Sequence, residues 1–241
     1  MPKTPKLVTH SLKQHPTVAI SDAFNAAGHA AAAQVVWHTE DRAAALGFLI
    51  VATAATVGVM RFGFSEGLFA KANGVSSLTS HTDHRSIAAA LSLDANSEPC
   101  CRQDLADLAA FVGLPLVGLS FAQHWLSLHL GCGDQLGFAM MCSVVCAVSR
   151  SLPAKANELV KVVFNLLFFV LPVAAFSVAN RDLQTGACIG LFAFAGIGVG
   201  ADRNSYIFNV RRENIFHYLI AIASYGMSFG LAASAGDIAL P

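Results

Sequence analysis

Charge is scarce in this sequence. Of its 241 residues only 12% are Asp, Glu, Lys or Arg, whereas 55% are apolar. An ordinary soluble domain carries about 25% charged residues, so the composition argues against a conventional soluble fold. Fifteen basic and fifteen acidic residues give a formal net charge of zero. Because the chain has no overall field that would attract nucleic acid, we expect no nucleic-acid partner.

Catalytic and metal-binding motifs are also lacking. The six cysteines form no Cys-x-x-Cys pair, and those in apolar runs, such as Cys142 and Cys146, are of the kind that packs as a small hydrophobic residue. No G-x-S-x-G turn, P-loop or dinucleotide-binding fingerprint occurs. We therefore predict no disulfide scaffold, no metal site and no cofactor, and we favour a protein that is not an enzyme.

Long apolar runs dominate what is present. A bilayer core about 30 Å thick is crossed by a helix of about 20 mostly apolar residues, because each backbone amide must find its partner within the segment. Six segments meet this description or come close to it: 43–64, 105–126, 135–149, 158–179, 184–201 and 214–235. The sequence predicts an all-α fold, a polytopic transmembrane helix bundle.

A seventh segment, 16–37, has the right length but contains several polar residues. The positive-inside rule tests whether it crosses, since Lys and Arg accumulate in cytoplasmic loops. If 16–37 crosses, all but Arg42 and Arg181 of the fifteen basic residues fall on the side of the N-terminus. This bias favours seven helices, with the N-terminus cytosolic and the C-terminus extracytoplasmic. The alternative is six helices plus an amphipathic N-terminal helix.

The domain organisation follows from these spans. Residues 1–15 form a basic cytosolic tail, and residues 16–241 form a single transmembrane helical domain. The connection 65–104 is too long to be a plain connector, and we place it in the cytosol. Its apolar stretch 87–93 is either an amphipathic surface helix or a buried loop helix.

Asp22, Asn25 and His29 are spaced by three and four residues, so on a helix they form one polar stripe. Polar groups at membrane depth are costly and normally face the interior of a bundle. Three interpretations stay open: helix packing, a solvent-filled cavity or substrate path, and a surface helix that does not cross. If the polar stripe faces the bundle, its expected partners are Lys161 or Asn165 in the cytosolic half and Gln123 or His124 in the outer half.

Ser120 and His124 lie four residues apart on the third predicted span. This pair resembles the Ser-x-x-x-His of seven-pass hydrolases related to the alkaline ceramidases, which complete a metal site with a His-x-x-x-His on the last helix. Here the last helix offers His217, but Ala221 stands where the second histidine would be. A catalytic zinc would lack an adequate set of ligands, so a membrane-embedded lipid hydrolase is only an alternative.

The sixth span contains two small-x-x-x-small motifs, Gly186 to Gly190 and Gly196 to Gly200. Such motifs let membrane helices approach closely, and we predict that these glycines pack against a neighbouring helix.

Two of the predicted spans contain a proline in their interior. Pro115 and Pro172 interrupt the third and fifth spans, where each removes a backbone hydrogen bond and predicts a kink.

Arg203, Arg211 and Arg212 precede the last span and suit anionic lipid headgroups on the cytosolic side.

Two stretches carry a resemblance to a family. Asp41 to Phe64, beginning Asp-Arg-Ala-Ala-Ala-Leu-Gly-Phe and ending Arg-Phe-Gly-Phe, and Arg212 to Tyr218, Arg-Glu-Asn-Ile-Phe-His-Tyr, are similar to animal multi-pass proteins of the transmembrane protein 276 kind. The resemblance implies a small polytopic protein and assigns no chemistry.

These observations lead to three functional hypotheses. The first is a membrane protein that acts by binding, as an accessory or scaffold subunit, with membrane lipids and another membrane protein subunit as partners. The second is a small-solute or ion transporter or channel that uses the polar stripe. The third is the lipid hydrolase.

Overall fold

The computed structural model describes residues 16–39, 41–63, 105–200 and 205–236. These residues are almost wholly helical, which confirms the all-α prediction. The predicted tail 1–15 and the predicted loop 65–104 lie outside the described residues. The elements, in order, are α1 (Pro16–Trp37), α2 (Arg42–Gly63), η1 (Ala109–Gly113), α6 (Leu114–Leu126), α7 (Cys132–Arg150), α8 (Ala154–Asn165), η2 (Leu166–Val170), α9 (Leu171–Asn180), α10 (Leu183–Phe194), η3 (Ala195–Val199), β1 (Tyr206–Ile207), β2 (Val210–Arg211) and α11 (Arg212–Ser234).

Five helical stretches are long and apolar enough to cross a membrane: Arg42–Met60, Leu105–Leu126, Cys132–Arg150, Ala154–Asn180 and Arg212–Ser234. The apolar stretch Leu183–Val199 is shorter. The segment 16–37 is one continuous helix, α1, at the predicted boundaries, although it does not belong to the five apolar stretches.

Both interior prolines follow a short π-helical turn. The π-helix η1 ends immediately before Leu114 and Pro115, and η2 ends before Leu171 and Pro172. Proline has no N–H to donate and its ring crowds the preceding turn, so the backbone widens there. Neither span is interrupted at its proline. Each continues as one apolar helical stretch.

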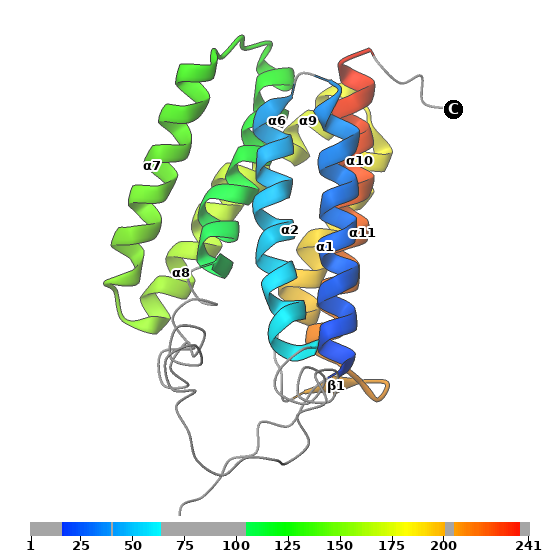
Figure 1. The fold of residues 1–241 in the computed structure, drawn as a ribbon. Coiled ribbons are helices and arrows are strands. Elements are labelled where there is room, and N and C mark those ends of the chain that lie inside the picture. The colour runs from blue at the N-terminus through cyan, green and yellow to red at the C-terminus, as the bar shows by residue number, and fades with distance from the viewer. Residues whose placement is uncertain (1–15, 40, 64–104, 201–204, 237–241) are drawn as a thin grey trace, which may run out of the picture.

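The helices run side by side and alternate in direction, so that α1 begins at the end of the bundle where the β-hairpin lies and α11 finishes at the opposite end (Figure 1). Helix α1 packs between α2 and α11, and α10 packs against α11. Helix α6 contacts α2 and α9, and α7 lies at the edge, where it touches η1, α8 and α6. Segments far apart in the sequence, α1 and α11, are therefore direct neighbours.

Aromatic and small side chains fill the interior. Phe48, Phe121, Phe169 and Phe176 are buried in one cluster, together with alanines of α1 and α2. The rings of Phe121 and Phe176 meet edge to face with centroids 5.0 Å apart, an arrangement that aromatic pairs favour. A cluster of this kind holds α2, α6 and α9 together.

The glycine prediction was wrong for two of the four positions. A Cβ added at Gly190 or Gly196 would meet nothing within 4 Å, so neither glycine lies at a close helix crossing. A Cβ at Gly186 would come 2.6 Å from the Ser177 hydroxyl, so Gly186 does pack closely. Gly200 has a φ of 68° and ends η3, a left-handed conformation that glycine adopts without steric cost. The glycine spacing identified a helix rich in small residues but not which of them face a neighbour.

The entry to α11 is a short antiparallel hairpin, which the sequence analysis did not predict. Its turn residues Phe208 and Asn209 both have positive φ, as a two-residue hairpin turn requires. Arg211 lies over the Tyr206 ring at 6.0 Å, and Arg212 donates to the Gly198 carbonyl oxygen at 3.0 Å. These two predicted headgroup residues thus have partners within the chain, while Arg203 lies outside the described residues.

Candidate functional site

The polar stripe lies inside the bundle. Asp22 is 4% exposed, Asn25 5% and His29 0%, although the helix that carries them is rich in alanine. Small side chains on α1 allow α2 and α11 to approach, and the polar groups then meet residues of α11. The interpretation of 16–37 as a helix on the surface is therefore wrong within this structure.

Asp22 pairs with His217 of α11. The Asp22 Oδ1 atom lies 2.8 Å from His217 Nδ1, and both side chains are nearly buried. The Ser21 hydroxyl lies 3.3 Å from the same nitrogen and donates to Asn214 Oδ1 at 3.1 Å. Four side chains from α1 and α11 thus form one small polar cluster.

His29 lies seven residues beyond Asp22 on α1, about two helical turns, and has partners at both ring nitrogens. Its Nδ1 atom lies 2.9 Å from the Asn25 carbonyl oxygen, and its Nε2 atom lies 2.9 Å from the Ser224 hydroxyl of α11. Because a carbonyl oxygen can only accept, Nδ1 carries a hydrogen. The Ser224 hydroxyl then donates a hydrogen bond to His29 Nε2, which fixes the ring between the two helices.

Two buried acceptor atoms of the polar stripe have no hydrogen-bond partner among the described residues. These are Asp22 Oδ2 and Asn25 Oδ1. Gly58 of α2 lies directly against the Asp22 carboxylate, so that a Cβ at position 58 would overlap Oδ2. The carboxylate is thus enclosed by α11 on one side and by the α2 backbone on the other.

The predicted partners of the polar stripe in the cytosolic half were wrong. Lys161 Nζ lies 2.9 Å from Asp107 Oδ1 and 2.7 Å from Glu158 Oε1, and Asn165 donates to the Lys161 carbonyl oxygen. The reason is the position of α8, which packs against α7 and the π-helices η1 and η2 and not against α1. Equal depth in the membrane was the basis of the prediction, but depth does not specify which helices are neighbours.

Asp107 is a buried ionisable residue that the sequence analysis missed. Its side chain is 1% exposed, with Lys161 at 2.9 Å and Arg150 Nε at 3.5 Å. The available signal was a lone carboxylate near the start of an apolar span, at the same end as the basic residues that close α7 and open α8. This Asp107 cluster (Asp107, Arg150, Lys161) connects three helices.

The predicted outer-half partners of the polar stripe also bind elsewhere. His124 Nε2 lies 2.8 Å from Asp41 Oδ2, which joins the end of α6 to the start of α2. Beyond His29 the buried face of α1 is apolar, formed by Ala32, Ala33 and Val36. No contact therefore links the polar stripe to Gln123 or His124 within the described residues.

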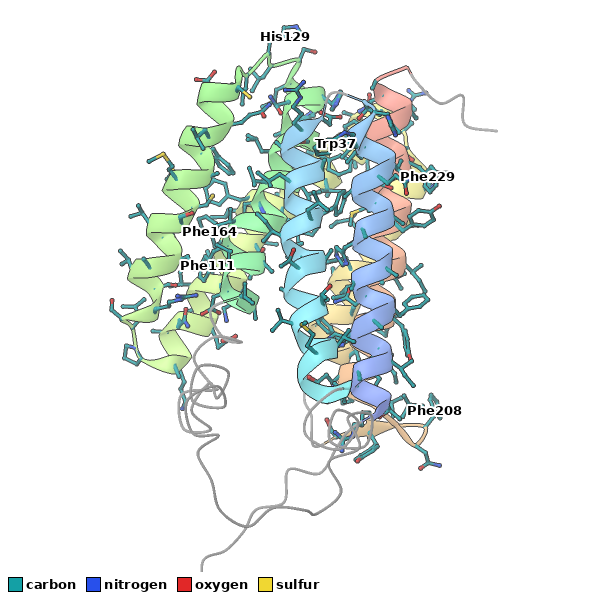
Figure 2. The ribbon with its side chains drawn as sticks, viewed as in Figure 1. Trp37, Phe111, His129, Phe164, Phe208 and Phe229 are labelled. Atoms are coloured by element: carbon teal, nitrogen blue, oxygen red, sulfur yellow. The ribbon has the colours of Figure 1, made fainter. Side chains whose placement is uncertain are left out.

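Asp41 and His124 border a hollow of about 650 Å³ at the end of the bundle opposite the β-hairpin. Trp37 and His129 mark this end and Phe208 marks the other (Figure 2). The described lining residues are mostly polar, and no lysine or arginine is among them. The lining residues are Thr39, Asp41, Gln123, His124, Ser127, Leu128, His129, Leu130, Gly131 and Gln135. None of them belongs to the polar stripe.

The arrangement offers little support for hydrolysis. Ser120 is fully buried, and its hydroxyl has no hydrogen-bond partner in the part of the chain that the structure describes. A serine nucleophile needs a base within hydrogen-bond reach. His124 is paired with Asp41, and His217 with Asp22. Among the described residues no group of three or more His, Cys, Asp or Glu side chains could hold a metal ion.

The α11 half of the site was also missed. Asn214, His217 and Ser224 recur at spacings of three and seven residues on one face of the last helix, as the polar stripe does on α1. Two such faces in one chain are a signal that the two helices pair.

Comparison of the chain with models of protein families, with curated proteins and with solved structures finds no match.

Proposed function

We propose that the chain is a seven-helix integral membrane protein that acts by binding, as an accessory or scaffold subunit beside another membrane protein. In this arrangement the N-terminus is cytosolic and the C-terminus is extracytoplasmic. A small polytopic protein is also what the resemblance to the transmembrane protein 276 kind implies.

One observation carries the proposal: ionisable side chains on the helices pair with each other across helix boundaries. Asp22 meets His217, Asp41 meets His124, and Asp107 meets Lys161. Groups paired in this way hold helices in register and are not free for a passing solute. Apolar residues separate the polar stripe from the hollow at the end of the bundle.

Of the five long apolar stretches, that of α7 is the least buried and leaves the most surface for a partner. Only 17% of its apolar stretch is buried inside the bundle, compared with 61% for Leu105–Leu126. Its exposed side chains include Met140, Val144 and Val148. A helix of a second protein packed along α7 would cover this surface, which lipid covers otherwise.

The test is the composition of the protein extracted from its native membrane in a mild detergent. The proposal predicts a second membrane protein in fixed stoichiometry, which Val144→Trp releases because a bulky ring forces packed helices apart. Ile222→Trp is the matched control, since Val144 and Ile222 are 62% and 51% exposed on different helices. A chain that is recovered alone, or a partner retained by both variants, would contradict the role of α7.

Transport of a small solute or ion is the second candidate. The specific observation in its favour is that Asp22 Oδ2 and Asn25 Oδ1 accept no hydrogen bond from any residue that the structure describes, because ionisable groups within a membrane domain often mark ion pathways. Proton, sodium and potassium fluxes in sealed proteoliposomes test it. A flux that is present with the wild type and absent with Asp22→Asn would favour transport over binding.

A further inference from the structure

The β-hairpin that precedes α11 presents apolar side chains to its surroundings. Phe208 at the turn is 96% exposed, and Tyr206 and Val210 of the two strands are 58% and 41% exposed. A single exposed apolar side chain is ordinary, but here three of them fall within five residues. The hairpin therefore offers a small apolar surface that the described part of the chain leaves uncovered.

Phe208 is an unusual residue for its place in the turn. Its φ is 50°, in the left-handed region, where asparagine and glycine are favoured and a bulky side chain is strained. Asn209, the other turn residue, has a φ of 64° and is of a type that this region suits. The phenylalanine ring thus does not help the chain to turn, and a contact of the ring outside the hairpin would offset its conformational cost.

The chain holds this hairpin between two apolar helical stretches. Leu183–Val199 precedes it, and Arg212–Ser234 begins directly after β2. The hairpin runs sideways across the ends of the upright helices (Figure 1), and Phe208 lies beyond α1 and α11, at the side of the bundle (Figure 2). For a bundle that crosses a membrane, this position is level with the lipid headgroups.

We propose that the hairpin Tyr206–Arg211 anchors the cytosolic end of the bundle to the membrane surface: the Phe208 ring inserts among the lipids of the cytosolic leaflet, and the Arg211 guanidinium binds an anionic headgroup beside it. The inference rests on the membrane arrangement of the proposed function. It does not require a partner subunit.

The side chains of the hairpin suit the region between headgroups and acyl chains. Aromatic rings concentrate at this depth, and the cytosolic leaflet carries anionic lipids. The Arg211 guanidinium lies over the Tyr206 ring, 6.0 Å from its centre, where the face of the ring attracts the cation. The N–H groups at the edge of the guanidinium can then donate to phosphate oxygens.

A soluble cytosolic protein is the competing occupant, because it too could cover an apolar hairpin tip. The hairpin, however, ends where a membrane-crossing stretch begins, at Arg212. This continuity with the span favours lipid as the surface that Phe208 meets.

The test places a fluorescent reporter on the hairpin of the full-length protein. Tyr206→Trp, combined with Trp37→Phe and Trp125→Phe, leaves a single tryptophan, which keeps an aromatic face for Arg211. The protein is reconstituted in vesicles of phosphatidylcholine and phosphatidylserine whose acyl chains carry bromine, a quencher that acts on contact. The proposal predicts strong quenching by the brominated lipid and weak quenching by acrylamide in the water on both sides.

Phe208→Asn then removes the ring without harm to the turn, because asparagine suits the left-handed conformation. The reporter should lose most of its quenching by lipid and gain quenching by acrylamide. Equal quenching by lipid with and without the Phe208 ring would overturn the proposal. So would a reporter that neither quencher reaches, because protein would then cover the hairpin.

Arg211→Gln tests the headgroup contact. It should reduce the quenching by lipid in vesicles that contain phosphatidylserine more than in vesicles of phosphatidylcholine alone, since only the former offer an anionic headgroup. An equal effect in the two kinds of vesicle would overturn the role of Arg211.

Ile222→Trp in the same tryptophan-free background is the control, since Ile222 is exposed within the apolar stretch of α11. If lipid quenches this position but not the hairpin reporter, the anchor is wrong and the membrane arrangement stands. If lipid quenches neither position, the membrane arrangement of the proposed function is wrong as well.

Discussion

Gly28 of α1 lies against Ala221 of α11, so closely that a Cβ on Gly28 would sit 2.8 Å from the Ala221 Cβ. This approach brings the two helices near enough for Asp22 to reach His217 and for His29 to reach Ser224. The last helix carries Ala221 where a ceramidase-like hydrolase would carry a metal-binding histidine. In this chain the position serves helix packing.

The first prediction concerns this crossing. Gly28→Leu should destabilise the protein by about 1–3 kcal/mol or more, because added side-chain volume in a close-packed interface forces the backbones apart. Gly190→Leu is the control, since a Cβ there meets nothing within 4 Å. Thermal unfolding in detergent measures both. Equal effects of the two substitutions would show that α1 and α11 are not in contact.

The second prediction concerns the His29–Ser224 hydrogen bond. Ser224→Ala leaves His29 Nε2 buried without a partner and should cost about 1–3 kcal/mol. Combining it with His29→Leu should cost less than the sum of the two single changes, because the pair is then removed together. A double-mutant cycle gives the coupling energy. A coupling energy of zero would mean that the two side chains do not interact.

The third prediction concerns the Asp107 cluster. Lys161→Met should destabilise the protein by up to about 3–5 kcal/mol, the range for breaking a buried ion pair, and the remaining Arg150 contact should reduce the loss. Glu158→Gln removes the exposed partner of Lys161 and should cost less than about 1 kcal/mol. Denaturation of the two variants side by side tests the ranking. If Glu158→Gln proves the more costly, the cluster does not stabilise the bundle.

The fold was predictable to the extent that apolar length decides it. Within the described residues, helices lie close to the six segments expected from hydropathy, since a helix in a bilayer must satisfy its own backbone. The helix at 16–37 was expected from the distribution of basic residues instead. The π-turns before Pro115 and Pro172 were not predictable in detail, because a proline can also break or bend a helix. The hairpin at Phe208 and Asn209 was missed because its two short strands carry no alternating pattern.

Only the α1 half of the site could be predicted from the sequence. The polar stripe was evident from its spacing on α1, and its burial followed from the cost of polar groups in a membrane. Its partners were not, because depth alone cannot distinguish His217 on an adjacent helix from Lys161 on a distant one. Contact between α1 and α11 depends on small side chains, and sequence spacing does not show which neighbour they meet.

The fourth prediction concerns topology. Phe208 is 96% exposed in the hairpin. Cys132 is exposed at the start of α7, and α7 starts at the end of the bundle opposite the hairpin (Figure 1). In sealed membranes, an impermeant maleimide should label Cys132 only from the extracytoplasmic side, and it should label Phe208→Cys, in a background lacking the native cysteines, only from the cytosolic side. Labelling of both positions from the same side would contradict seven crossings.

The binding role itself is tested most directly by a photo-reactive amino acid at position 144 of α7, irradiated in the native membrane. The account predicts one discrete adduct with another protein at position 144 and none at position 222 of α11, which is similarly exposed. Adducts with lipid alone at both positions, or the same protein adducts at both, would contradict a subunit that binds its partner through α7.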